Sequence, residues 1–289
     1  MKKLVVLSGK GGTGKTTLSS YLISSMNINK FADCDVDAPN LDQITNLDDF
    51  SVNKTPYQGS SLFKIDEDKC ISCGKCFSSC RFLAIDKKDK KFRINEYMCE
   101  GCALCYHVCP VNAISEYYIN TGEVIKYSKT NTSFVTAKLN VGSGASGKLV
   151  SEVRQTLNSV KLNSEITLVD GSPGVGCAVI ASLTGNDYSI IVTEASLSGF
   201  SDLKRIVSLS IKMNIRPLVV INKADLNFTL TSQIKGFLEK ENITYLGSIR
   251  YDWNILKRNN NQEYDKNSIG LLDLEQIKNN IKKIIEDGN

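Results

Sequence analysis

The sequence has no marked excess of charge of one sign. Its 289 residues include 35 Lys and Arg against 31 Asp and Glu, a net charge of +4, and the basic residues form no block. This pattern predicts neither nucleic acid nor an anionic membrane surface as a partner.

Long apolar runs are also missing. The run Leu4–Leu7 is too short for the core of a signal peptide, and no run approaches the length of a transmembrane helix. We therefore expect a cytoplasmic protein with no membrane partner. Cytosolic thiols stay reduced, so the ten cysteines are not expected to form disulfides. Eight of them fall between Cys70 and Cys109, which indicates metal binding.

Both ends of the chain predict an α/β fold. Short apolar runs rich in β-branched residues are typical of strands buried on both faces of a parallel sheet. Apolar residues at helical spacing lie between them, as at Leu18, Leu22 and Met26. The alternation predicts βαβ units in a doubly wound, mostly parallel sheet. The expected strands are Leu4–Leu7, Ile166–Val169, Ile190–Val192, Leu218–Ile221 and Tyr245–Ile249.

The middle of the chain breaks this alternation. Cysteines and charges replace the helix–strand pattern over 54–127, which we interpret as a domain inserted after the second strand. Residues 1–53 and 128–289 then form the main domain, and 120–139 are expected to return to it as strands. An apolar stripe from Leu274 to Ile285 predicts a final helix packed on the sheet, because it lacks the aromatic residues of a membrane anchor.

A glycine-rich segment follows the first strand and opens the first helix, where the phosphate-loop pattern GxxxxGK[ST] belongs. Glycines let backbone N–H groups curl around phosphate oxygens, and the helix N-terminus adds partial positive charge. Lys15 is predicted to reach the β- and γ-phosphates, and the Thr16 hydroxyl to ligate Mg²⁺. The segment is Gly9-Lys10-Gly11-Gly12-Thr13-Gly14-Lys15-Thr16-Thr17.

The second lysine of this loop, Lys10, carries a family resemblance. KGGTGKTT resembles the phosphate loop of the MinD/ParA family, which includes the nitrogenase iron protein and the Mrp-type cluster carriers. The resemblance implies a P-loop ATPase that binds ATP or ADP with Mg²⁺. It also implies an ATP-dependent homodimer in which Lys10 reaches the partner's phosphates. The alternative is a solvated loop lysine.

The same resemblance assigns roles to two aspartate-bearing segments. The segment from Asp33 to Leu41 stands where the family has its first switch, with Asp35 expected to orient the attacking water and Asp37 a second possibility. An aspartate is suited to hold a water in line with the γ-phosphate. Asp170, which follows the strand ITLV, resembles the Walker B aspartate that begins the second switch.

The base side of the nucleotide is also assigned by resemblance. Asn222 and Lys223 end the strand LVVI and match the family's adenine-side loop. Arg250, Tyr251 and Asp252 are expected to line the base.

Two tandem cysteine runs fill the predicted insertion. The spacing C-x2-C-x2-C-x3-C occurs twice and is the signature of two-cluster bacterial ferredoxins, in which the fourth cysteine of each run ligates the other cluster. The signature predicts two [4Fe–4S] clusters in an α+β ferredoxin-like domain. One cluster is assigned to Cys70, Cys73, Cys76 and Cys109, and the other to Cys99, Cys102, Cys105 and Cys80. Zinc, the alternative, usually takes two CxxC pairs.

One histidine and two cysteines lie outside these two ligand sets. His107 is the single histidine and lies between Cys105 and Cys109; because all eight sulfur positions are filled, an ordinary loop residue is favoured over a ligand. Cys34 is interpreted as a small buried residue. Cys177 follows Asp170 at the spacing of a bridging-cluster ligand in the nitrogenase iron protein, but a second such cysteine is not evident, so a buried thiol near the interface is favoured.

Three functions remain open. The first is an ATPase that couples nucleotide state to low-potential electron transfer. The second is a carrier or assembly factor for iron–sulfur clusters or a metal cofactor, and either would need an unidentified redox or acceptor protein. The third is a spatial organiser of the MinD/ParA type, which would need a DNA-binding face or a membrane helix. Fully cysteine-ligated clusters retain their iron, which favours the first.

Overall fold

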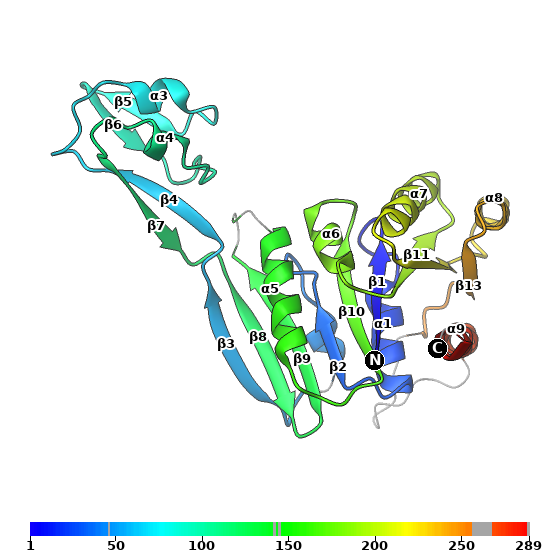
Figure 1. Ribbon diagram of the computed structural model, residues 1–289. Helices are drawn as coiled ribbons and strands as arrows, with labels where there is room; N and C mark the ends of the chain where they lie inside the picture. The colour runs from blue at the N-terminus through cyan, green and yellow to red at the C-terminus, as the bar shows by residue number, and fades with distance from the viewer. Residues whose placement is uncertain (46, 141–142, 144–145, 256–267, 288–289) are drawn as a thin grey trace. The chain divides into compact units, whose positions relative to one another are not determined.

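The computed structural model describes residues 1–45, 47–140, 143, 146–255 and 268–287. The chain forms two compact units (Figure 1). The first comprises Met1–Thr55, Val124–Leu139 and Ser146–Asn289, and the second is built mainly from Pro56–Glu123.

The first unit is organised around a sheet whose strand order is β13-β12-β11-β1-β10-β2-β9-β8-β3. From β13 to β9 each neighbouring pair is parallel, with β1 between β10 and β11. The carboxyl ends of these strands therefore meet at one edge, where α/β proteins bind ligands. The strands are β1 (Lys2–Ser8), β2 (Lys30–Asp33), β3 (Ser51–Tyr57), β8 (Gly122–Lys129), β9 (Thr132–Leu139), β10 (Ile166–Pro173), β11 (Tyr188–Glu194), β12 (Arg216–Asn222) and β13 (Thr244–Ile249).

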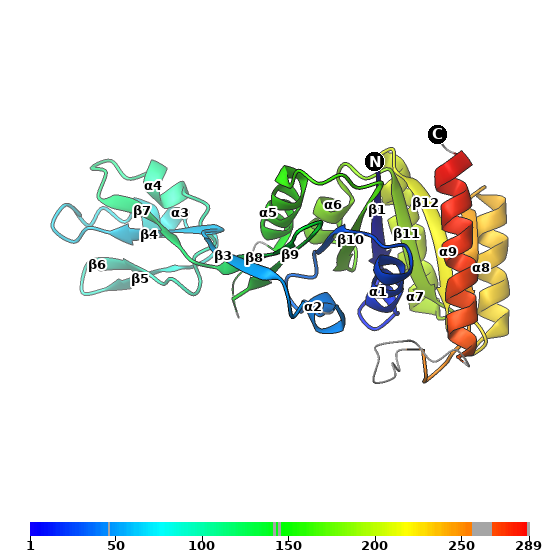
Figure 2. The same cartoon turned by 90° about the horizontal axis from the view of Figure 1, so that it is seen from below.

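Helices cover both faces of this sheet (Figures 1 and 2). On one face, α1 (Lys15–Ser25) and α9 (Ile269–Asp287) pack together over the strands. The right-handed crossovers from β9 to β13 direct the intervening helices to the opposite face. Those helices are α5 (Ser146–Ser159), α6 (Cys177–Leu183), α7 (Leu197–Lys212) and α8 (Phe228–Lys240), and a short α2 (Leu41–Ile44) follows β2.

The apolar pattern explains this layering. Leu4 and Val6 of β1 belong to the core beneath α1 and α9, and the intervening Val5 and Leu7 are fully buried as well. A strand buried on both faces belongs in the middle of a two-sided sheet. The predicted stripe on the final helix is confirmed, since Leu274, Ile277 and Ile281 of α9 are buried in the same core.

The predicted doubly wound fold is confirmed, and all five expected strands are present. One strand of the sheet, β3, was not expected. Its sequence SVNKTPY is polar, six of its seven residues are exposed, and it lies at the end of the strand order. An exposed edge strand needs no apolar alternation, so this segment has no period-2 pattern from which a strand could be predicted.

The second unit contains two short antiparallel pairs and two short helices. β4 (Ser60–Ile65) pairs with β7 (Ile114–Ile119), and β5 (Ile85–Lys88) with β6 (Lys91–Ile94). The helices are α3 (Lys75–Ser79) and α4 (Leu104–His107). Its small core consists of Phe63, Ile65, Cys76, Ile85, Phe92 and Ile114. None of the helices in the described part of the chain has the length and apolar character needed to span a bilayer.

Candidate functional site: a phosphate loop and two cysteine cavities

The phosphate loop joins β1 to α1 at the carboxyl edge of the sheet. Gly12 and Gly14 have φ angles of 77° and 92°, a region that residues with a Cβ rarely adopt. A Cβ on Gly14 would also lie 2.3 Å from the Asn222 amide nitrogen. Both constraints select glycine, and they leave the backbone N–H groups of the loop free to bind an anion.

Asn222 and Lys223, from the end of β12, brace this loop from the side. The Asn222 amide donates to the carbonyl of Thr13 at 2.7 Å. The Lys223 ammonium donates to the carbonyl of Gly12 at 3.4 Å and forms an ion pair with Glu194 at 2.5 Å. These contacts hold the phosphate loop in its conformation. The sequence predicted only that Asn222 and Lys223 lie beside the adenine base, so this supporting role was not expected.

The expected Mg²⁺ and phosphate residues meet beneath the loop. The Lys15 ammonium lies 3.0 Å from the Asp170 carboxylate, and the two side chains are only 6% and 0% exposed. Thr16 donates to the same carboxylate at 2.9 Å and Ser19 at 2.7 Å. Burial alone would lower the pKa of Lys15, but Asp170 and Asp33 raise it above its ordinary value. Lys15 therefore stays cationic, as a phosphate ligand must.

The three aspartates of the first switch lie in different environments. Asp33 is fully buried and accepts backbone N–H bonds from Asp35, Asn40 and Leu41 at 2.9–3.1 Å. Burial and the neighbouring Asp170 raise its pKa to about 7. Its backbone contacts give it the role of holding the switch loop in shape.

Asp35 is half-buried, and burial raises its pKa, with Lys15 acting in the opposite direction. Asp37 is exposed. Asp35 is thus a partly exposed switch aspartate that interacts electrostatically with Lys15, whereas Asp33 does so from a fully buried position.

Backbone contacts tie the two switch segments together. The Cys34 N–H donates to the carbonyl of Asp170 at 2.7 Å, and the Ser172 hydroxyl donates back to the carbonyl of Cys34. The Leu139 N–H, at the end of β9, donates to the carbonyl of Val36 at 2.9 Å. A displacement of one switch therefore acts on the other and on β9.

The remaining nucleotide-side residues make contacts within the chain. Lys10 donates to the Ser198 hydroxyl at 3.0 Å. Arg250 pairs with Asp273 at 2.7 Å, and Asp252 accepts bonds from Ser268 and from the N–H of Gly270, both at the start of α9. The contacts of Arg250 and Asp252 orient the end of β13 against α9. Tyr251, which lies between these two residues in sequence, is exposed.

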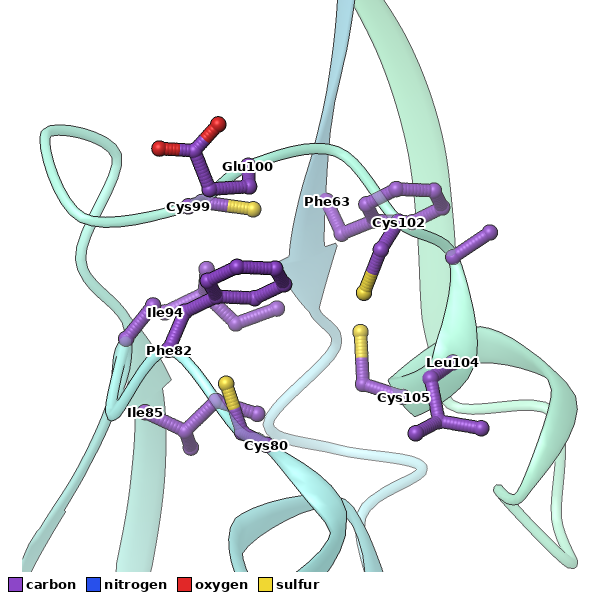
Figure 3. Close-up of a pocket in the computed structure, with 12 residues that line it drawn as sticks. Phe63, Cys80, Phe82, Ile85, Ile94, Cys99, Glu100, Cys102, Leu104 and Cys105 are labelled. Carbon is purple, nitrogen blue, oxygen red and sulfur yellow. The ribbon is translucent and has the colours of Figure 1, made fainter.

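The eight clustered cysteines line two separate cavities in the second unit. Cavity A is lined by Cys70, Cys73, Cys76 and Cys109 and measures about 320 Å³, part of it open to solvent. Cavity B is lined by Cys80, Cys99, Cys102 and Cys105 and measures about 340 Å³. Figure 3 shows the four thiols of cavity B pointing into the space between them. Cys80 and Cys109 have thus crossed to the cavity of the other run, as the signature requires.

Four thiols around one cavity fit an iron–sulfur cubane by donor chemistry, because thiolates are the ligands such clusters take. Apolar side chains close the walls, including Phe92 in cavity A and Phe63 in cavity B. His107 is exposed and lines neither cavity. Among the described residues, no three His, Cys, Asp or Glu side chains form a site for a single metal ion.

The two other cysteines lie in the first unit. Cys34 is fully buried, and burial raises its pKa to about 12, so its thiol is unreactive. The prediction that Cys177 is buried is wrong: it is exposed, because it is the first residue of α6, although it lies close to Gly147 of α5.

Ser19 is a site residue that the sequence did not reveal. Its hydroxyl bonds both Asp170 and the carbonyl of Lys15. The one available signal was its position a single helical turn after Lys15, which places both side chains on one face of α1.

A doubly wound sheet with this phosphate loop, joined to a unit with two four-cysteine cavities, defines a P-loop protein of MinD/ParA fold with an inserted dicluster ferredoxin domain. The family model described as a 4Fe-4S dicluster domain matches residues 63–115. Two Methanocaldococcus jannaschii proteins are similar over most of their length. MJ0578 is 36% identical over 230 residues, which cover 78% of this chain and 79% of MJ0578. MJ0579 is 31% identical over 227 residues, which cover 77% of this chain and 80% of MJ0579.

The chain belongs to the family of these two proteins. Solved structures share its fold at low sequence identity. The cell-division ATPase MinD of Pyrococcus furiosus has a TM-score of 0.55 at 15% identity and covers 98% of this chain and 99% of its own. An ATP complex of Cyanothece McdA has a TM-score of 0.55 at 16% identity, with coverage of 99% and 96%.

Proposed function

We propose that this protein binds and hydrolyses ATP with Mg²⁺ and couples its nucleotide state to low-potential electron transfer through two [4Fe–4S] clusters. In this proposal Lys15 binds the β- and γ-phosphates, Thr16 ligates Mg²⁺ and Asp170 holds the outer shell of the metal. Asp35 orients the attacking water. The support is the shared carboxylate of Asp170, which already brings Lys15 and Thr16 together at about 3 Å.

The observation that carries the redox assignment is the complete set of sulfur ligands. Each cavity offers four cysteines, so every iron of a cubane would have a protein thiolate. A cluster without an open iron position keeps its metal and changes oxidation state, which suits an electron carrier.

Coupling to the nucleotide is supported by chain connectivity. The Leu139 N–H bonds the first switch, and the next residue, Asn140, bonds the carbonyls of Thr121 and Asn120 in the inserted unit. A switch that responds to the γ-phosphate would therefore pull on a strand that continues directly into the insertion. By resemblance, ATP would also assemble a homodimer through Lys10.

One observation favours the carrier or assembly function as the second candidate. Cys73 and Cys102 are exposed, one in each cysteine set, so an acceptor thiol could approach each cavity. The fold likeness to MinD is the sole support for a spatial organiser.

Iron content and transfer to an acceptor distinguish the first two functions. Anaerobically prepared protein should contain about eight iron atoms, and Cys73→Ala or Cys102→Ala should each remove about half while ATP binding persists. The loaded protein is then incubated with an iron-free ferredoxin. Retained iron with reversible reduction supports electron transfer. Quantitative transfer of iron to the acceptor supports a carrier, and stoichiometric zinc without iron refutes both.

A further inference from the structure

The two cavities are related by an internal repeat. Every residue that lines cavity A has a counterpart at the equivalent position of the sequence repeat, and that counterpart lines cavity B. Backbone conformation repeats as well: Leu83 and Asn112, which follow Cys80 and Cys109 at the same distance, both have left-handed φ angles, 53° and 50°. The two sites can therefore be compared position by position.

Most of the paired lining positions are identical. Phe92 in cavity A corresponds to Phe63 in cavity B, and the alanine and isoleucine pairs match in the same way. Four pairs differ, and two of these change charge. Where cavity A has Ile71 and Lys75, cavity B has Glu100 and Leu104.

Both charge differences act in the same direction. A cluster gains negative charge on reduction, so the Lys75 ammonium at cavity A favours its reduced form. The Glu100 carboxylate at cavity B, shown beside Cys99 in Figure 3, disfavours reduction there.

A hydrogen bond adds to this difference. The Ala113 N–H donates to the Cys109 sulfur of cavity A at 3.3 Å. Ala84, its counterpart, makes no such bond to Cys80 in the part of the chain that the structure describes. An N–H donor to a ligand sulfur stabilises the reduced cluster and raises its potential.

Several charges near Cys70 form ion pairs. Before Cys70, Asp66 pairs with Lys69 and Glu67 pairs with Lys91 and Arg93. Arg81 follows Cys80 and acts against the Glu100 effect, but it is exposed and lines neither cavity.

We propose that Lys75 and Glu100 separate the potentials of the two clusters, so that cavity A holds the higher-potential cluster and electrons pass from cavity B to cavity A. This inference rests on the proposed electron-transfer function. Each reduction takes one electron from a low-potential donor, which is oxidised by one electron, and makes or breaks no bond. The first electron should reside at cavity A. The separation should correspond to at least a tenfold difference in reduction equilibrium, about 59 mV for a one-electron couple.

The test is an anaerobic potentiometric titration of the full chain with dithionite, followed by electron paramagnetic resonance. Cys102→Ala keeps the cavity A cluster and Cys73→Ala the cavity B cluster, and the first form should have the higher midpoint potential. Lys75→Leu and Glu100→Ile each import the counterpart residue, so the packing is already compatible. Lys75→Leu should lower one midpoint, Glu100→Ile should raise the other, and the double variant should bring them together.

Controls separate charge from packing. Lys75→Arg keeps the charge and should leave both midpoints unchanged. Lys90→Gln removes an exposed lysine from the turn between β5 and β6, which lines neither cavity, and should also have no effect. Because Lys75 and Glu100 are exposed, added salt should narrow the separation.

The outcomes distinguish this inference from the proposed function. Two reducible clusters with equal midpoints, with the reverse order, or with a separation that the double exchange does not reduce would overturn the inference and leave electron transfer standing. If a cysteine variant loses both clusters, the midpoint that moves in Lys75→Leu still identifies cavity A. A chain without reducible iron would refute the proposed function itself.

Discussion

Asp170→Ala should destabilise the first unit far more than the loss of an ordinary ion pair. The variant leaves the Lys15 ammonium, only 6% exposed, without the carboxylate that lies 3.0 Å away. Removing one partner of a buried pair costs roughly 3–5 kcal/mol. Asp33 and Asp35 also stabilise the Lys15 charge, so we expect a loss near the lower limit of that range. In a domain of this size, 1 kcal/mol shifts Tm by about 2–4 °C, so the decrease should be roughly 6–12 °C.

Thermal unfolding of nucleotide-stripped protein, followed by circular dichroism, measures this effect independently of ATP binding. Asp49→Asn is the matched control, since it breaks a solvent-exposed pair with Lys129 and should cost less than about 1 kcal/mol. Lys15→Met combined with Asp170→Ala should be more stable than the sum of the single effects predicts. Additivity within about 0.5 kcal/mol would refute the argument that the two charges stabilise each other.

Three further predictions concern the switch and the interface. Lys10→Ala should keep ATP binding by the monomer but lose ATP-dependent dimerisation in sedimentation velocity; dimerisation at the parent level would contradict the trans role of Lys10. Asp35→Ala should spare ATP binding and lower the rate of phosphate release at least about tenfold. An equal loss of ATP affinity and of phosphate release would mean that Asp35 contributes to nucleotide binding rather than to orienting the attacking water. Asp33 has a folded pKa near 7 against 3.8 in an unfolded chain, so its stabilising contribution is present below about pH 4 and lost as pH rises to 7. The stability difference between the parent and Asp33→Asn should therefore change over this range, and a constant difference in urea unfolding from pH 4 to 7 would refute it.

The sequence was most informative where short spacing determines structure. The apolar runs predicted five strands, and β1, β10, β11 and β12 are buried on both faces of the sheet, as the fully buried Leu4 and Val5 illustrate. The cysteine spacing predicted which sulfurs would share a cavity, including the crossing of Cys80 and Cys109, because three cysteines of each set lie close together in the sequence.

Features formed by residues far apart in sequence could not be predicted in this way. The brace that Asn222 provides to the carbonyl of Thr13 depends on how β12 ends beside the phosphate loop, and no local pattern specifies that contact. The second bond of Ser19 and the pairing of Arg250 with Asp273 are of the same kind. The residues that distinguish the two cavities can be read directly from the sequence. Their meaning required knowing that Lys75 and Glu100 occupy counterpart places in the two linings.

The pairing of β4 with β7 has a consequence for inheritance and for engineering. The insertion starts and finishes on two adjacent antiparallel strands, with Leu62 opposite Tyr117, so it can be received by a host chain at a single point. Within it, each half supplies one cysteine to the other half's cavity, so a deletion of either half would damage both sites. The insertion should therefore be gained or lost as one unit. A transfer of the insertion to another protein should include both β4 and β7.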